Sequence, residues 1–410
     1  MDRKADELLM GLGKNGLPGE GNPSSENLTV VMVGALPVDL TQVKGGVEAV
    51  ILNLFEGFKT IPSLKVVHVV FTKEISDYQV VALTENILIH FIPFRVKYEM
   101  MDYAINDELF RQIIDAEKPE IIHVQEITPQ IIRLLRYPKH NIVVTQHGIM
   151  REELKYAAGL SQKLKCAFKA AVEKYLFPVF KHVIFISNYN KVLYPKKDVH
   201  GKQIFNPVNP IFFQKQSSEQ EEKNTLVYVG VLSRRKNIRI VIEALNELKK
   251  EGKIFKLHVI GGFRDNGYEA EVMGLVNEFD LKDQIVFHGW KKQNEIRKIY
   301  RECPMFILPS QQETLPVSIG EAMAQGKVVI ASDVGAVKEM FSDGYSGFLF
   351  RKNDRDDLAR VLRTVYDNPS LKEIGARAQA EAQEKFHPAL VAEKTVHFYR
   401  EVIAQNKENS

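Results

Sequence analysis

The chain has 410 residues, of which 45% are hydrophobic and 26% charged, and its formal net charge is +3. This length allows two domains with separate cores, and a charge so close to zero excludes bulk electrostatic attraction to nucleic acid. The sequence has no apolar run long enough to span a bilayer and no signal-peptide pattern. Its two cysteines, Cys166 and Cys303, are expected to be unpaired and packed, which favours a reducing, cytoplasmic location.

Residues 1–27 are rich in Gly, Pro, Ser, Asn and charged side chains, and we expect them to form a loose leader outside any core. Apolar runs and amphipathic stretches then alternate along the chain. The expected strands are residues 28–34, 66–71, 87–92, 121–124, 142–145 and 183–187, with helices at 46–58 and 106–117. Such alternation is typical of a parallel sheet covered by helices on both faces.

Residues 161–180 form a further amphipathic stretch that allows two interpretations. Its apolar side chains share one helical face, and four lysines lie among them: Leu164, Phe168, Ala171, Val172, Tyr175 and Leu176, with Lys163, Lys165, Lys169 and Lys174. We favour a core-packed helix with a solvated lysine face. The alternative is a helix that lies on anionic lipid.

The polar run at residues 215–224 is the best linker candidate, and the alternation restarts after it. Expected strands follow at 226–229, 256–260, 284–287, 306–308, 328–331 and 346–350, with helices at 238–251, 268–279, around Glu321, at 358–366 and at 388–405. We therefore predict two doubly wound domains and a C-terminal closing helix, with boundaries at 28–213, 214–387 and 388–410. Ligands of such sheets bind at the carboxyl ends of the strands, here in the cleft between the domains.

The most informative feature is a pair of glutamates, Glu313 and Glu321. They follow the apolar run 305–309 and a polar turn, and Pro316 suits the first turn of a helix that would carry Glu321 about two turns in. The free amides at the start of that helix favour phosphate. The two carboxylates and these amides would together fit a sugar nucleotide. Taken alone, however, a loop acid and a surface helix acid are the commoner case.

A second segment begins at Gly230, where a strand ends, and continues to Arg234, Arg235 and Lys236 before the next helix. Cations at a helix N-terminus oppose its dipole unless an anion is present. A diphosphate would supply that anion. A solvated basic loop is the better interpretation of Arg234 alone, whereas the strand–loop–helix setting favours a functional Lys236.

Two weaker signals lie in the first half. Gly45 and Gly46 open the first helix and would let the main chain approach a ligand, although an ordinary turn has the same pattern. The segment lacks the Gly-Lys-Ser/Thr ending of a nucleotide P-loop. His147 stands before Gly148 at the expected end of a strand, where sites are built, although a single histidine is more often a buried structural residue.

We expect no metal site, because no cluster of His, Cys and carboxylates has ligand spacing. Asp354 and Asp356 match an Asp-x-Asp pattern by which some glycosyltransferases hold a divalent ion. They precede an expected helix, so we interpret Asp354 as its N-cap.

Taken together, four motifs resemble glycosyltransferase family 4, whose members are retaining enzymes of the two-domain GT-B fold. They are the Glu-x7-Glu block from Glu313 to Glu321, the Gly-x5-Lys segment from Gly230 to Lys236, the Gly-Gly-x-Glu stretch at Gly45 and the Thr-x-His-Gly stretch that contains His147. The resemblance covers nearly the whole chain after the leader. It implies two Rossmann-like domains that face a central cleft.

The resemblance also implies roles for the residues that match the motifs. The implied catalytic residues are His147, beside the sugar and the acceptor, and Glu313, near the reacting carbon. The implied donor-binding residues are Gly45, Gly46, Gly230, Arg235, Lys236, Glu313, Thr314, Leu315 and Glu321. Among them, Lys236 would neutralise the diphosphate and Glu321 would hold the ribose. The family usually has an arginine where this chain has Val231, so Arg234 or Arg235 would have to replace its charge.

The implied activity is retaining transfer of a sugar from a nucleoside-diphosphate sugar to a hydroxyl of a sugar, lipid-linked or small-molecule acceptor. It needs no metal or cofactor. Nucleic acid is not an expected partner, whereas peripheral contact with a membrane is. Residues 95–103 are expected to touch the acceptor. Two alternatives stay open: a GT-B subunit that binds sugar nucleotide without transferring it, and a sugar-nucleotide epimerase.

Overall fold

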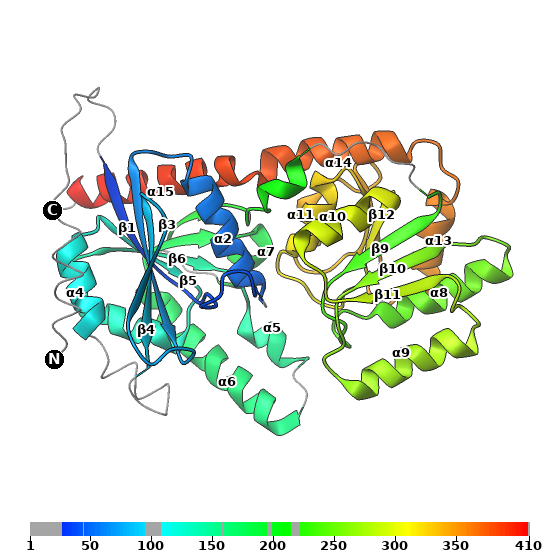
Figure 1. Cartoon of the computed structure of the whole chain (residues 1–410), viewed down its shortest axis with the longest axis horizontal. Helices are drawn as coiled ribbons and strands as arrows, with labels where there is room; N and C mark the ends of the chain where they lie inside the picture. The colour runs from blue at the N-terminus through cyan, green and yellow to red at the C-terminus, as the bar shows by residue number, and fades with distance from the viewer. Residues whose placement is uncertain are drawn as a thin grey trace.

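The computed structural model describes residues 27–43, 45–94, 108–156, 159–194, 199–214 and 222–408. Two β-sheets with mainly parallel strands lie side by side, each flanked by helices. A pair of consecutive helices spans one side of both sheets (Figure 1). The expected leader up to residue 26, most of the expected linker and the expected acceptor segment at 95–103 lie outside the described residues. The domain boundaries given above remain predictions.

The first sheet has the strand order β3-β4-β2-β1-β5-β6-β7-β8. Its strands are β1 (Leu28–Val33), β2 (Leu64–Thr72), β3 (Gln79–Thr84), β4 (Ile87–Pro93), β5 (Ile121–Gln125), β6 (Asn141–Gln146), β7 (His182–Phe185) and β8 (His200–Gln203). All neighbouring pairs are parallel except β3 and β4. The sequence analysis missed the two edge strands, β3 and β8. β8 contains no apolar side chain, whereas the apolar run at residues 80–83 in β3 was a usable signal.

Helices cover both faces of this sheet. Those of the first half are α2 (Gly46–Phe58), α4 (Glu108–Glu117), α5 (Met150–Leu154), α6 (Gly159–Leu176) and α7 (Asn188–Leu193), with 3-10 turns η1 (Pro129–Arg136), η2 (Phe177–Val179) and η3 (Pro210–Phe213). The bounds predicted for α2 are confirmed. One core contains apolar side chains of α2 and the other those of α4, so the sheet is buried from both sides.

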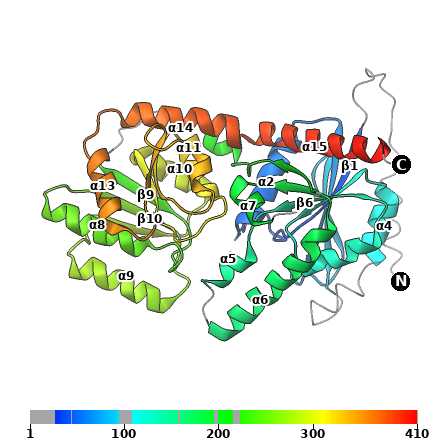
Figure 2. The same cartoon turned by 180° about the vertical axis from the view of Figure 1, so that it is seen from behind.

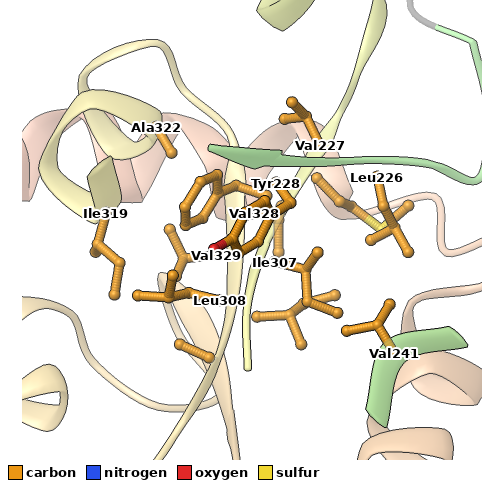
Figure 3. Packing of buried hydrophobic residues seen from close by; sticks show 14 of the residues in the cluster. Leu226, Val227, Tyr228, Val241, Ile307, Leu308, Ile319, Ala322, Val328 and Val329 are labelled. Carbon is orange, nitrogen blue, oxygen red and sulfur yellow. The ribbon is translucent and has the colours of Figure 1, made fainter. Parts of the chain in front are cut away.

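The second sheet has the order β11-β10-β9-β12-β13-β14 and is parallel throughout. Its strands are β9 (Thr225–Val229), β10 (Lys256–Ile260), β11 (Ile285–Gly289), β12 (Met305–Leu308), β13 (Val328–Ser332) and β14 (Gly347–Phe350). Its helices are α8 (Ile238–Lys250), α9 (Asn266–Glu278), α10 (Gln293–Glu302), α11 (Val317–Ala324), α12 (Val337–Met340), α13 (Arg355–Val365) and α14 (Leu371–Phe386). Figure 3 shows apolar side chains of β9, β12 and β13 packed together in its core.

The closing helix, α15 (Pro388–Glu408), follows α14 and returns to the first sheet. Figures 1 and 2 show α14 beside the second sheet and α15 beside the first. Val391, Val396, Phe398 and Tyr399 of α15 belong to the same core as α2. The helix therefore joins the two halves through burial of its own apolar face. The predicted fold class, two doubly wound α/β units with a C-terminal closing helix, is confirmed.

The favoured interpretation of α6 as a core-packed helix is wrong. Of its side chains only Glu173 is buried, whereas Leu164 and Tyr175 are 62% and 73% exposed. The carboxylate of Glu173 accepts hydrogen bonds from Gln146 Nε2 at 2.6 Å and from the backbone N–H of Met150 at 3.0 Å. These polar contacts turn the apolar stripe toward solvent. Within the described residues, no helix combines the length and the hydrophobicity that crossing a bilayer requires.

A buried hydrogen bond tests how α15 is held. Tyr399 Oη lies 2.5 Å from His123 Nδ1, and the other ring nitrogen contacts Thr145 at 2.7 Å. We expect Tyr399→Phe to lower the free energy of unfolding by about 1–2 kcal/mol, because it removes the hydroxyl that forms a hydrogen bond with the buried Nδ1 of His123. The measurement is the urea midpoint of the full chain. Tyr345→Phe, at an exposed position, is the control, and an equal midpoint in both variants would contradict the expectation.

Candidate active site

A cavity of about 270 Å³ lies between the two halves. Its lining comes from both: Glu152, Lys155, Tyr156 and Tyr189, then Gln311, Gln312, Asp333, Val334, Gly335 and Lys352. Tyr156 Oη donates to the carbonyl of Gln311 at 3.2 Å, and Lys352 Nζ donates to Tyr156 Oη at 3.1 Å. The loop that runs into Glu313 thus forms one wall of the cleft.

Glu339 forms hydrogen bonds between the two halves, next to this cavity. It belongs to α12, and its carboxylate accepts the backbone N–H groups of Asn188 and Tyr189, each at 2.8 Å, at the start of α7. Gln203 Nε2 donates to the same carboxylate at 3.1 Å. A carboxylate at a helix N-terminus satisfies orphan donors and complements the dipole. These contacts fix how the first half meets the second.

Glu313 is the centre of the second half's contribution. Its residue is only 5% exposed, and it lies in the loop between β12 and α11. Lys236 Nζ, from the loop after β9, lies 2.5 Å from Glu313 Oε1, and Ser310 Oγ donates to the same oxygen at 2.6 Å. Because β9 and β12 are neighbours in the sheet, their loops meet at the same edge. The fold thereby joins two motifs 77 residues apart.

The two arginines beside Lys236 have different surroundings. Arg235 Nη1 lies 3.7 Å from Glu313 Oε2 and donates to the carbonyl of Gln312 at 2.8 Å. The side chain of Arg234 is 64% exposed and pairs with Glu271 at 2.6 Å on α9. Of these two arginines, therefore, Arg235 lies beside Glu313 and Arg234 does not. The solvated interpretation of Arg234 fits its exposure.

Charge and burial compete at this pair. Burial would raise the pKa of Glu313, but Lys236 and Arg235, with the hydrogen bonds from Lys236 and Ser310, outweigh it and hold the pKa below its ordinary value. Burial lowers the pKa of Lys236, and Glu313 opposes that effect. Glu313 is therefore ionised at neutral pH, with cations on both of its oxygens.

Gly335 explains why a turn after β13 matters to this arrangement. A Cβ at Gly335 would lie 1.7 Å from the carbonyl oxygen of Glu313, and its φ is +56°. A side chain there would collide with backbone, so this turn supports the Glu313 loop. The role of Gly335 depends on a contact between the loops that follow two neighbouring strands, β12 and β13.

Glu321 lies nearer the start of its helix than expected. α11 begins at Val317, and Pro316 is its N-cap residue. Glu321 therefore lies in the second turn of the helix, whereas we expected two full turns before it. The helix begins later because Pro316 has extended backbone angles. Burial raises the pKa of Glu321 to about 7, and no hydrogen bond or ion pair reaches its carboxyl group within the described residues. Leu315, just before the helix, is buried.

The first half contributes His147 at the end of β6. The residue is 7% exposed, and its Nε2 hydrogen-bonds Gln125 Oε1 at 2.7 Å. Burial lowers the pKa of His147 to about 4. The imidazole is therefore neutral at physiological pH and offers hydrogen bonds rather than a positive charge.

Gly45 and Gly46 border a second cavity, of about 200 Å³, between the ends of β1 and β5. Gly45 is the N-cap residue of α2, and its N–H donates to Glu48 Oε2 at 3.0 Å. A Cβ on Gly46 would meet no protein atom within 4 Å. Internal packing therefore does not explain this glycine, and the space beside it is open to a ligand.

The sequence analysis missed two carboxylates of the first half. Glu126 follows β5 directly, has a φ of +91°, and lines the cavity beside Gly46. Burial, with the charge of Glu153, raises its pKa to about 7, and burial raises the pKa of Glu173 to about 8. The position of Glu126 right after a predicted strand was a usable signal. Its left-handed backbone was not visible in the sequence.

The structure brings only part of the predicted site into direct contact. Arg235, Lys236 and Glu313 interact with one another, whereas no hydrogen bond or ion pair links them to Gly46, His147 or Glu321 in the described ranges. Asp354 Oδ1 accepts the N–H of Asp357 at 2.9 Å and caps α13, which confirms the capping interpretation. Among the described residues, no group of three or more His, Cys, Asp or Glu side chains has the geometry of a metal site.

Two family models match the chain in tandem. The model for Glycosyltransferase Family 4 matches residues 44–205, and the model for Glycosyl transferases group 1 matches residues 211–384. An uncharacterized glycosyltransferase of Methanocaldococcus jannaschii is 25% identical over 319 residues, which are 74% of this chain and 81% of that protein. The N-acetyl-alpha-D-glucosaminyl L-malate synthase of Bacillus anthracis is 21% identical over 326 residues, 76% of this chain and 82% of that enzyme.

Solved structures agree on the architecture. Sucrose-phosphate synthase from Thermosynechococcus elongatus superposes with a TM-score of 0.77 at 19% identity, over 92% of this chain and all of that one. HepE of Anabaena, in complex with UDP and glucose, superposes with a TM-score of 0.67 at 16% identity, over 90% of this chain and 98% of that one. The fold is therefore that of the GT-B glycosyltransferases. With both halves matched by their models, the chain belongs to glycosyltransferase family 4.

The buried pair at the centre of the site predicts a measurable coupling. We expect Lys236→Met to lower the free energy of unfolding by about 3–5 kcal/mol, because it leaves a buried carboxylate without its nearest cation. Adding Glu313→Gln should restore much of this loss. The measurement is urea unfolding of both variants and of Glu313→Gln alone.

The control is Lys256→Met, which breaks the exposed 2.6 Å pair with Glu222 and should cost about 1 kcal/mol or less. A double variant no more stable than Lys236→Met would show that the charge pair does not hold these loops.

Proposed function

We propose that this protein is a retaining glycosyltransferase that moves a sugar from a nucleoside-diphosphate sugar to an acceptor hydroxyl. The observation that carries the proposal is the buried contact of Lys236 with Glu313 at the cleft, with Arg235 beside it. HepE, of the same fold, is described in complex with UDP-glucose. The pairing of cations with a sugar-facing acid at a cleft suits a donor of that chemistry.

The cations would stabilise the leaving group. As the bond between the sugar carbon and the diphosphate oxygen breaks, negative charge grows on the diphosphate. Lys236 and Arg235 are already fixed by Glu313 and Gln312, so they need little reorganisation to meet that charge. A bound diphosphate would share the two cations with Glu313. No step of this scheme requires a metal ion.

Retention would follow from attack on the face that the leaving group departs from. The acceptor oxygen forms the new bond to the sugar carbon, and its proton passes to an oxygen of the departing phosphate. His147 is neutral because its pKa is about 4, and it would orient hydroxyls of the sugar or the acceptor. Glu313 would face the sugar near the reacting carbon.

The remaining donor contacts come from Glu321, from the backbone at Thr314 and Leu315, and from the glycines Gly45, Gly46 and Gly230. The unpaired carboxyl of Glu321 would accept hydrogen bonds from ribose hydroxyls. Gly46, which faces open space, would let the start of α2 approach the diphosphate across the cleft. Closure of the two halves would exclude water from the reaction.

The acceptor is a sugar, a lipid-linked sugar or a small molecule in this proposal, and the reaction takes place on the cytoplasmic side. One relative, the N-acetyl-alpha-D-glucosaminyl L-malate synthase of Bacillus anthracis, is named for a compound that contains L-malate, a small acid. Analysis of products from a labelled donor distinguishes transfer from the two alternatives: sugar on an acceptor supports transfer, an isomerised donor indicates an epimerase, and binding without turnover indicates a non-catalytic subunit.

Removal of the Glu313 charge tests the mechanism. We expect Glu313→Gln to lower the turnover number roughly 100- to 1,000-fold, the usual effect of losing a group that stabilises the transition state. The rate of donor turnover is measured after the unfolding midpoint shows that the variant is folded. Glu278→Gln, at an exposed position of α9, is the matched control, and activity in the presence of chelator should equal that of the untreated enzyme. A Glu313→Gln enzyme as fast as the control would refute the assignment.

Glu321 makes donor binding depend on pH. Its pKa of about 7 means that the carboxylate, the form that accepts hydroxyl hydrogen bonds, becomes populated as the pH rises. We expect the affinity for UDP-glucose, or for whichever nucleotide sugar binds best, to increase roughly tenfold from about pH 6 to about pH 8. Calorimetry at several pH values measures this change. In Glu321→Gln the dependence should disappear, whereas its persistence would assign the titration to another group.

A further inference from the structure

α6 exposes an apolar stripe to solvent. The side chains that face the protein are the buried Glu173 and the half-buried Cys166, Ala170, Val172 and Leu176. Leu160, Leu164 and Tyr175 are 74%, 62% and 73% exposed, and Phe168 is also exposed. The buried side chain is Glu173, which Gln146 and the backbone of Met150 hold. Both views show α6 at the outer edge of the first half (Figures 1 and 2).

These apolar side chains form one stripe. At about 100° per residue, Leu160, Leu164, Ala167, Phe168, Ala171 and Tyr175 fall within an arc of roughly 100°, and all six are exposed. The helix is 18 residues long, which at 1.5 Å per residue gives a stripe about 27 Å long. An unpartnered stripe of this length is unusual on a soluble surface and indicates an interaction site.

The charge around the stripe is of one sign. Lys163 and Lys174 lie along one edge of the stripe and Lys165 lies beyond the other edge, whereas Lys169 lies further round the helix. All four lysines are exposed. The single acidic residue of α6 is the buried Glu173. An apolar stripe bordered by lysines, on a helix without an exposed acidic residue, is the pattern of a helix that lies in the interface of an anionic membrane.

We propose that α6 docks this protein onto a membrane surface that contains anionic lipid. The apolar stripe enters the boundary between headgroups and acyl chains, and the flanking lysines contact the lipid phosphates. The proposal concerns a surface of the first half and does not depend on the reaction proposed above. A lipid surface suits it better than a second protein copy, because self-association would bring the lysines of two helices together.

The test is sedimentation of the full chain with vesicles of phosphatidylcholine, with or without phosphatidylglycerol. We expect binding to the anionic vesicles only, weakened by high salt. Replacing Lys163, Lys165, Lys169 and Lys174 with Gln should weaken vesicle partitioning at least tenfold, because each basic residue near an anionic surface contributes roughly fivefold. Leu164→Ser with Phe168→Ser should weaken it as well. These residues are exposed, so the unfolding midpoint should stay unchanged.

The matched control removes four exposed lysines from the second half: Lys282, Lys298, Lys338 and Lys372, each changed to Gln. It alters the net charge equally and should bind vesicles like the parent protein. Three results would overturn the proposal: absence of binding to anionic vesicles, equal loss in the control, or a dimer in light scattering that the Leu164→Ser, Phe168→Ser variant abolishes.

Discussion

The buried contact between Lys236 and Glu313 is the constraint on which the rest of the site depends. A carboxylate that is 5% exposed must have cations and hydrogen-bond donors around it. Lys236, Arg235 and Ser310 supply them, from the loops after two neighbouring strands. The contact between these loops positions the residues before Glu313 that line the cleft. Gly335 must lack a side chain because a Cβ there would collide with the carbonyl oxygen of Glu313. Structure and electrostatics are thus fixed by the same few atoms.

The two glutamates of the Glu-x7-Glu block acquire different properties from their surroundings. Glu313 is ionised because cations outweigh its burial. Glu321 is half-buried without a cation beside it, and desolvation raises its pKa to about 7. One residue type therefore supplies a fixed negative charge beside the cations and a carboxyl group that titrates near neutral pH, whose ionised form can accept hydrogen bonds from a ligand's hydroxyls. This division agrees with the proposal that one acid faces the sugar and the other the ribose.

The cleft depends on contacts that hold the two halves in a fixed relative position. Glu339 caps α7 from the other half, and Tyr156 bridges to the carbonyl of Gln311. On the far side, α15 returns to the first sheet and buries Phe398 and Tyr399 there. Within the first half, Glu126 and Gly46 line one cavity. Glu126 has a left-handed backbone there, a conformation that persists where the surroundings enforce it.

The sequence alone determined the alternation of strands and helices, the two-unit architecture and the residue types of the predicted site. Hydrophobic periodicity and helix N-caps depend on residues close together in the chain, so they can be read from the sequence. It identified α2 and the capping by Asp354 for this reason. The edge strand β8 was missed because it contains no apolar side chain. Only the tertiary structure decided that Arg235 rather than Arg234 faces Glu313, that Gly335 supports that loop, and that α6 turns its leucines outward. Each of these depends on contacts between segments far apart in the chain, and periodicity in one segment contains no information about them.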